Sequence, residues 1–124
     1  MNVLYIAIGG ATGAVLRYWV SNGAYALFGR GFPYGTLSVN IIGSLIMGIL
    51  YVVLVERVHE SAELRAALIV GLLGAFTTFS TFSIDTINLI ESGEQLKAGL
   101  NIVCSVVLCV LGCWLGMLAA RQIY

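Results

Sequence analysis

Five hydroxyl side chains and two phenyl rings follow one another in Thr77–Ser83, inside a stretch that carries no charge from Ala66 to Ile84. A hydroxyl buried in hydrocarbon without a partner costs about 2–7 kcal/mol. We therefore expect so polar a run to line a path or a protein interface. None of these side chains titrates near neutral pH, so a path here is not built around proton exchange.

The two phenyl rings of this run lie three residues apart, at Phe79 and Phe82, and so share one helical face. A Phe pair at this spacing is usually core packing. Here the rings alternate with hydroxyl donors, and the edge of an aromatic ring is electropositive. Ring edges and O–H groups together could replace water around a small anion.

The composition indicates a membrane protein, because 60% of the residues are hydrophobic and only 10% are charged. A bilayer core of about 30 Å needs ~20 apolar residues in a helix. We predict an all-α membrane protein, with residues 1–124 as a single domain of four transmembrane helices and short loops. The predicted spans are Val3–Leu27, Gly35–Val55, Leu64–Ile90 and Leu96–Ala120.

The third span is longer than the bilayer core requires. Its 27 residues would extend ~40 Å as a straight helix, and it contains Gly71, Gly74, Thr77 and Thr78. A helix broken near its middle is one prediction, and a straight, tilted helix is the alternative. Broken backbone at membrane depth is tolerated only where it is buried in protein or lines a cavity, and its freed carbonyls can bind a cation.

Positive charge is almost balanced between the two sides of the predicted bundle. One side has both termini and Arg57, Arg65 and Arg121, and the other has Arg30 and Lys97. Orientation normally follows an excess of Lys and Arg in cytoplasmic loops. We therefore expect copies to insert both ways, a single topology being the alternative. Two inverted copies would supply the inverted repeat that many transporters use, so an antiparallel homodimer is our hypothesis.

Polar side chains within the other spans allow two interpretations each. Asn40 has a buried amide that either joins two helices or contacts a permeating ion. Arg17 reaches the interface if its span ends near Asn22, and lies deeper, attracting anions, if the span continues to Leu27. Asp85 is expected near an interface.

Small residues recur four apart, a spacing that lets helix backbones approach closely in lipid. The pairs are Gly9 with Gly13, Ser44 with Gly48, and Gly112 with Gly116. This pattern predicts helix packing and carries no information about a substrate.

The three cysteines and the one histidine give no metal signature. Cys104, Cys109 and Cys113 have spacings typical of neither a metal site nor a redox pair, so inert, buried thiols are expected. His59 is expected to be a solvated loop residue, because no second His or nearby Cys could complete a metal site.

Three motifs together resemble the Fluc family of small microbial fluoride channels. They are Gly9–Tyr18, Gly35–Gly43 and Gly74–Ser83. The similarity covers all four spans in order, at the usual length of the family. It implies passive fluoride export across the cell membrane by a dual-topology homodimer with two antiparallel pores.

The resemblance also implies roles for individual residues of the pore. Phe79 and Phe82 would be its paired phenylalanines, and Asn40 its asparagine from the second helix. Ser80 and Thr81 would belong to the polar track along which the ion moves. Fluoride itself comes from the resemblance, whereas the polar run and the inverted pair were predicted from the residues.

Two further roles follow from the resemblance and lie outside the pore. Arg17 would be the first-helix arginine near the aqueous vestibule. Gly74 and Thr77 would offer backbone carbonyls from both subunits to a structural sodium ion at the centre of the dimer.

Other function classes have less support. A four-span multidrug or guanidinium exporter needs a membrane-embedded carboxylate, and the first three spans contain none before Asp85. A non-conducting structural subunit would leave the run of Thr, Ser and Phe unexplained. We predict no enzymatic activity, because no nucleophile–base pair or phosphate loop stands outside the spans, and no nucleic-acid partner.

Overall fold

Every regular element in residues 2–57 and 61–123, the part of the chain that the computed structural model describes, is helical. Four of the helical spans are long and apolar enough to cross a membrane. These spans confirm the predicted all-α membrane fold, and the chain is a multi-pass membrane protein. His59, which was expected in a solvated loop, lies outside the described residues.

The four spans begin and end within three residues of the predicted bounds, and two of them contain π-helical segments. The second and third spans are each built from several elements. The elements are α1 (Asn2–Phe28) in the first span, α2 (Tyr34–Leu50) and η1 (Tyr51–Arg57) in the second, α3 (Ala62–Arg65), η2 (Ala66–Leu73), α4 (Gly74–Phe76) and α5 (Phe79–Glu91) in the third, and α6 (Gln95–Ile123) in the fourth.

Glycine and proline set the ends of the helices at one side of the bundle. Gly29 follows α1 with φ of 84°, and Gly93 follows α5 with φ of 81°. Glycine adopts this left-handed conformation without the steric cost of a Cβ, which makes it the common residue just after a helix. Pro33 precedes α2, where its missing N–H would have had no helical partner.

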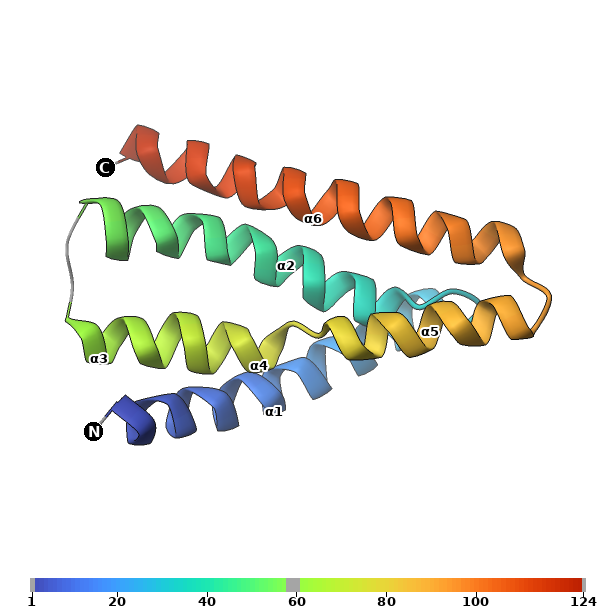
Figure 1. Cartoon of the computed structure of the whole chain (residues 1–124), viewed down its shortest axis with the longest axis horizontal. Helices are drawn as coiled ribbons and strands as arrows, with labels where there is room; N and C mark the ends of the chain where they lie inside the picture. The colour runs from blue at the N-terminus through green and yellow to red at the C-terminus, as the bar shows by residue number, and fades with distance from the viewer. Residues whose placement is uncertain (1, 58–60, 124) are drawn as a thin grey trace.

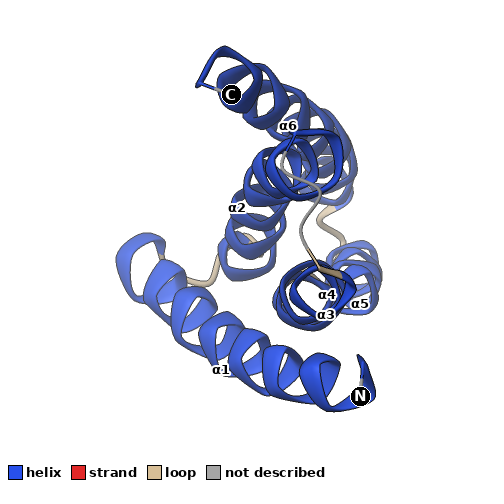
Figure 2. Cartoon of the chain, turned by 90° about the vertical axis from the view of Figure 1, so that its left-hand side faces the viewer, coloured by secondary structure: helices blue, strands red, loops and turns tan. Residues whose placement is uncertain are grey.

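The spans form an antiparallel bundle with both termini at one end (Figure 1). α2 packs along α6, and α1 packs against η2 and α4. Figure 2 shows α1 running obliquely to the other helices, on the side away from α6. The first half of the third span thus lies against α1, and its second half, α5, packs mainly on α6 beyond a break in the backbone, while α1 also contacts α2 directly.

Close contact between spans depends on glycine. A Cβ at Gly9 or Gly13 of α1 would meet the carbonyl oxygens of Ala67 and Leu72. On the other side, a Cβ at Gly116 of α6 would collide with α2 backbone. The predicted role of small residues in packing is confirmed at these positions, and also at Gly48, whose Cβ would meet α6.

The most completely buried apolar side chains belong to the second and third spans. Val39, Val52 and Leu73 are each at most 1% exposed. Many large apolar side chains of α1 and α6 are exposed instead. In a protein that crosses a bilayer, such a surface faces lipid or another subunit.

Candidate functional site

The third span is broken at Thr77 and Thr78. Thr77 has φ −89° and ψ 157°, and Thr78 has φ −152° and ψ 115°, so both are extended. Two adjacent β-branched residues favour this backbone. Thr78 also caps α5, because its Oγ1 accepts a hydrogen bond from the Thr81 amide at 3.2 Å. The predicted mid-span break is confirmed, and the straight-helix alternative is wrong.

Asn40 on α2 holds the break from the facing helix. Its Nδ2 donates to the Thr78 carbonyl at 3.1 Å, and its Oδ1 accepts from the Thr78 amide at 2.8 Å. One side-chain amide therefore pairs with both backbone groups of an extended residue, as a neighbouring strand would. Asn40 thus joins two helices, as one of its two interpretations predicts. The second N–H of its Nδ2 is not used in this pairing.

Two backbone carbonyls lose their helical donors at the break. In an uninterrupted helix, the Gly74 carbonyl would accept from the Thr78 amide and the Thr77 carbonyl from the Thr81 amide. Those amides donate instead to Asn40 and to the Thr78 hydroxyl. Gly74 is also exposed. The carbonyls of Gly74 and Thr77 are thus released from helical pairing.

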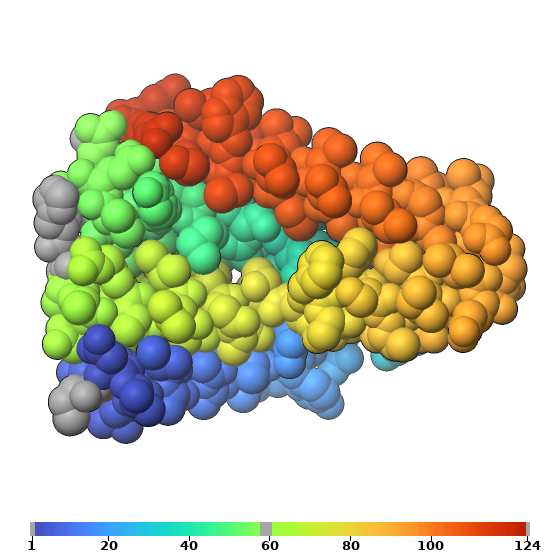
Figure 3. Space-filling view, viewed as in Figure 1, coloured from blue at the N-terminus to red at the C-terminus, as the bar shows by residue number. Residues whose placement is uncertain are grey.

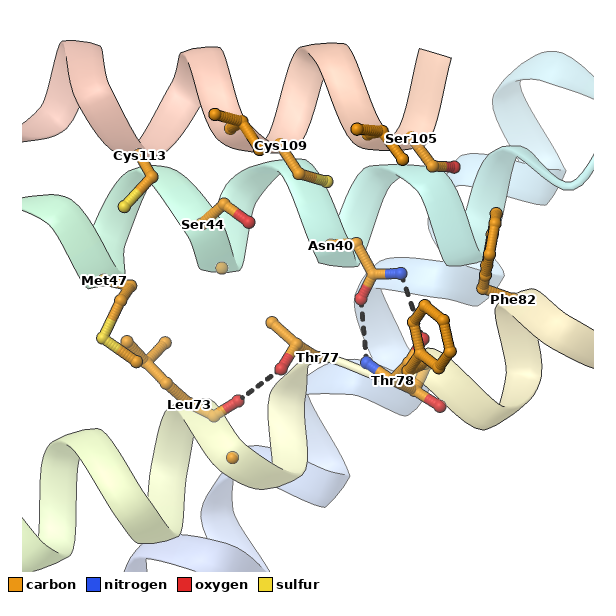
Figure 4. Close-up of a pocket in the computed structure, with 15 residues that line it drawn as sticks. Asn40, Ser44, Met47, Leu73, Thr77, Thr78, Phe82, Ser105, Cys109 and Cys113 are labelled. Atoms are coloured by element: carbon orange, nitrogen blue, oxygen red, sulfur yellow. Dashed lines mark hydrogen bonds between the residues drawn. The ribbon is translucent and has the colours of Figure 1, made fainter. Parts of the chain in front are cut away.

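A cavity of about 430 Å³, here called the phenyl cavity, opens beside the break between α2, α5 and α6. Figure 3 shows the surface hollowed there, and Figure 4 shows side chains from these elements pointing into the space. Most of its wall is apolar. Its polar lining consists of Asn40, Ser44, Thr77, Thr78 and Ser105.

Phe79 and Phe82 lie together at the phenyl cavity, as their spacing predicts. Their ring centroids are 5.3 Å apart and the rings are inclined by 40°. Phe82 is half-buried, whereas Phe79 is 78% exposed. The Phe79 ring thus lines the cavity and is at the same time largely exposed at the surface of the chain.

A second cavity of about 400 Å³, here called the arginine cavity, lies on the other side of the break, against α1. Arg17 lines it together with hydroxyl groups from α1, α2 and α5. Within residues 2–57 and 61–123, the ion pairs join Lys97 to Glu94 and Arg121 to Glu56. In this part of the chain Arg17 therefore has no acidic side chain within ion-pair distance.

Thr78 lines both cavities and stands at their boundary. Its hydroxyl donates to the Thr81 hydroxyl at 3.0 Å and lies 3.3 Å from the Ser80 hydroxyl. Thr81 faces the arginine cavity. A short chain of hydroxyls thus begins at the point where the two cavities meet.

The structure brings most of the predicted site residues to the two cavities. Ser80 differs, because it is exposed and lines neither cavity in this chain. The phenyl cavity has Asn40, Gly74, Thr77, Phe79 and Phe82, and the arginine cavity has Arg17 and Thr81.

Sequence reasoning missed the contribution of α6 to the site. Ser105, Cys109 and Cys113 line the phenyl cavity. They recur every four residues, a spacing that places them on one helical face and could have revealed them. The expectation that the thiols are buried is wrong, because all three cysteines are half-buried, and Cys109 and Cys113 line this cavity. Their expected inertness stays a prediction.

Several proteins similar to this chain share one name. Residues 4–117 match the family described as CrcB-like protein, Camphor Resistance (CrcB). A protein of Coxiella burnetii named Fluoride-specific ion channel FluC is 53% identical over 124 residues, covering 99% of this chain and 100% of its own length. Proteins of the same name match from Shewanella amazonensis (55% identical, 93% of this chain, 92% of the relative) and Methylococcus capsulatus (52%, 99% of this chain). The chain spans 54% of the length of the Methylococcus relative.

Proposed function

The chain belongs to the CrcB-like family, and from this premise we propose that it is a fluoride channel that lets fluoride leave a microbial cell passively across the cell membrane. The observation that carries the proposal is the full-length identity of 53% to a fluoride-specific ion channel. It is supported by a polar break that lies between two cavities in a span otherwise apolar.

The proposed route for the ion runs between the two cavities past Thr78. Arg17, unpaired with acid in the described residues, would draw an anion into the arginine cavity. The hydroxyls of Thr78 and Thr81 stand next along the route. Beyond the boundary, the second N–H of Asn40 and the edges of the phenyl rings would receive the ion.

Neutral donors suit the passage of a halide. Moving a bare ion into a medium of low dielectric costs on the order of 20 kcal/mol by idealised Born accounting. Hydroxyl, amide and ring-edge donors offset part of this cost without trapping the anion as a ring of fixed cations would. Weak binding at several successive positions is what conduction requires.

We further propose that the working unit is an antiparallel homodimer, because the phenyl cavity of one chain is open. Phe79 is 78% exposed at its mouth, and Ser80 is exposed beside it. A second, inverted copy would cover both residues and narrow the space around the ion. The near balance of basic residues between the two ends allows such insertion. Crosslinking that yields only parallel pairs would reject this arrangement.

A structural sodium ion at the centre of this dimer is a further part of the proposal. The carbonyls of Gly74 and Thr77 have lost their helical donors, and oxygen is the ligand that hard cations prefer. Unwound backbone carbonyls bind sodium in discontinuous transporter helices. Gly74 is exposed, so its carbonyl could meet the same groups of a second copy. The ion would fasten the two breaks together.

An exporter driven by proton exchange is a weaker candidate. Its carboxylate would have to be Asp85, which accepts a hydrogen bond from the Thr36 hydroxyl at 2.6 Å. Asp85 also lines a hollow with Arg30 and Pro33, at the end of the bundle where α1 connects to α2. This position, near an interface as expected, supports a structural role for Asp85 in joining α5 to α2. The centre of the span is then left without an acid.

The experiment that tests the proposal is ion efflux from liposomes reconstituted with the purified full chain. Fluoride should leave down its own gradient, chloride should be retained, and an imposed proton gradient should not drive the flux. Replacing both phenylalanines (Phe79→Ile with Phe82→Ile) should lower fluoride efflux at least about tenfold, which corresponds to ~1.4 kcal/mol of barrier.

The matched control is Phe28→Ile, which changes an exposed phenyl ring at the end of α1, away from both cavities. This variant should conduct like the wild type. Liposomes that stay closed to fluoride would reject the channel function. Normal efflux through the double variant would reject the pore and leave the membrane fold intact.

A further inference from the structure

Three sulfur atoms from two helices face the phenyl cavity. Cys109 and Cys113 come from α6, and Met47 comes from the facing α2. Figure 4 shows the cysteine side chains projecting from α6 toward α2 at the cavity. The third cysteine, Cys104, does not line it. A cavity proposed to pass a hard anion thus has a soft sulfur face along one wall.

The two cysteines share one helical face. Figure 4 shows their sulfur atoms turned to opposite sides along α6, so at least one side chain must rotate for both to meet one ion. Residues four apart on a helix have Cβ atoms about 5–6 Å apart on the same face. Cys109 and Cys113 meet this condition, and both are half-buried rather than sealed within the bundle. Two thiolates at this spacing can close on one ion from its opposite sides, and the cavity gives the ion a way in.

Charge decides which soft cation fits. A cation of charge +2 bound by two thiolates forms a neutral complex, and this avoids the cost of about 20 kcal/mol for an unbalanced ion in low dielectric. Zinc has the same charge but takes four ligands in structural sites and three with water in catalytic ones. Within the described residues, neither His nor acid lines this cavity to complete such a set. Thiolate and thioether ligands favour soft metals that accept fewer donors.

We propose that Cys109 and Cys113 chelate one soft, thiophilic divalent cation, with Hg(II) as the representative ion and the Met47 thioether as a weaker third donor. From mercuric chloride, two S–H and two Hg–Cl bonds break, two S–Hg bonds form, two protons pass to water and two chloride ions leave. No electron is transferred. If the proposed channel function holds, on which this consequence rests, the bound metal sits on the ion path and blocks it.

The test is retention of mercury by the purified full chain in detergent. The protein is loaded with mercuric chloride and washed with a monothiol, which removes mercury held by one sulfur but not mercury held by two. Bound metal is then measured by intact-protein mass spectrometry. The wild type should retain one mercury per chain, and Cys109→Ser or Cys113→Ser should retain at most a tenth as much.

Cys104→Ser is the matched control, because it removes a thiol of the same helix that lies off the cavity. It should retain mercury like the wild type, and Met47→Leu should weaken retention without abolishing it. Equal retention by wild type and Cys109→Ser, or loss of retention in Cys104→Ser, would overturn the site.

Fluoride efflux from liposomes separates the site from the channel function. Each variant is compared with itself before and after mercuric chloride. Mercury should stop efflux through wild type and Cys104→Ser, and a dithiol added afterwards should restore it. Retained mercury without any block would overturn its position on the path. Absence of efflux before mercury, with retention intact, would reject the proposed function and leave the site standing.

Discussion

The two halves of the third span are held in the bundle by different kinds of contact. The first half, from Ala62 to Phe76, lies against α1 through backbone that glycine brings close. The second half, α5, is fastened by side-chain hydrogen bonds, among them Thr36 to Asp85 at 2.6 Å and Asn101 to Thr86 at 3.0 Å. The break stands where one kind of contact gives way to the other.

This difference shows how a membrane protein can keep a polar cavity beside a rigid wall. In lipid there is no hydrophobic force between helices, so close packing and hydrogen bonds hold them together. Close packing against α1 fixes the first half where the glycines lie. Hydrogen bonds fix the second half at a few points, and the space between those points remains as the two cavities. Asn40 ties the halves together by holding Thr78.

Enlarging a residue in the close-packed half should have the largest effect. In Gly13→Leu, the new side chain would meet the Leu72 carbonyl and adjacent backbone, which cannot move aside as a side chain could. We expect the free energy of unfolding to fall by about 3 kcal/mol or more, which is the upper end of the cost of overpacking. Thermal unfolding in detergent should show a variant that no longer folds stably.

Gly23→Leu is the control for this prediction, because a Cβ at Gly23 of the same helix meets nothing within 4 Å. Its stability should match that of the wild type. If Gly13→Leu folds as well as Gly23→Leu, the close contact with α1 does not hold the first half.

Removing the tie between the halves should have the next largest effect. Asn40→Ala leaves the amide and carbonyl of Thr78 without their partner. A buried unsatisfied group costs about 1–3 kcal/mol. We therefore expect the free energy of unfolding to fall by about 2 kcal/mol and fluoride efflux to be lost. Chemical unfolding and liposome efflux measure the two. Asn88→Ala, an exposed site on α5, should change neither; equal results for both variants would contradict the role of Asn40.

A single hydrogen bond of the second half should matter less. Thr86→Val removes the hydroxyl that accepts from Asn101, a residue only 2% exposed. Interhelical hydrogen bonds in membranes contribute about 0.6 kcal/mol on average. We therefore expect the free energy of unfolding to fall by about 1 kcal/mol, with efflux retained. Thr86→Ser keeps the hydroxyl and should restore stability. A loss as large as that of Gly13→Leu would show that the two halves are held alike.

The smallest effect is expected from an ion pair outside both halves. Arg121 donates to Glu56 at 2.8 and 3.2 Å and joins the ends of the fourth and second spans. Both side chains are about one-third exposed, and an ion pair so open to solvent contributes little to stability. Arg121→Gln should lower the free energy of unfolding less than any of the changes above, without changing efflux. Raising the salt concentration should narrow the difference from the wild type.

Most of the fold was predictable, because long apolar runs in a bilayer have few alternatives to a helix. The third span was predicted as Leu64–Ile90 and found as Ala62–Glu91. Its break was one of two predictions, since Gly74, Thr77 and Thr78 weaken a helix without deciding that it breaks. The partner of the break was not predictable, because Asn40 is far from Thr78 in the chain and could have paired with any neighbouring helix.

Part of the site escaped prediction because the rotation of a helix about its axis is set by its neighbours. The run Thr77–Ser83 was expected to line a path or a protein interface, but its spacing did not show that Ser80 would be exposed while Thr81 faces the arginine cavity. Cys109 and Cys113 were expected to be buried, yet they are half-buried and line the phenyl cavity. Spacing shows which residues share a face, but not toward what the face is turned.

The residues by themselves determined that this chain crosses a membrane four times and carries neutral donors in its third span, since burial in hydrocarbon leaves polar backbone and side chains few options. Tertiary packing alone decided that Asn40 would clasp Thr78, that the break would separate two cavities, and that sulfur would face one of them. These outcomes depend on which helix faces which, and that choice is made by contacts between residues distant in the chain.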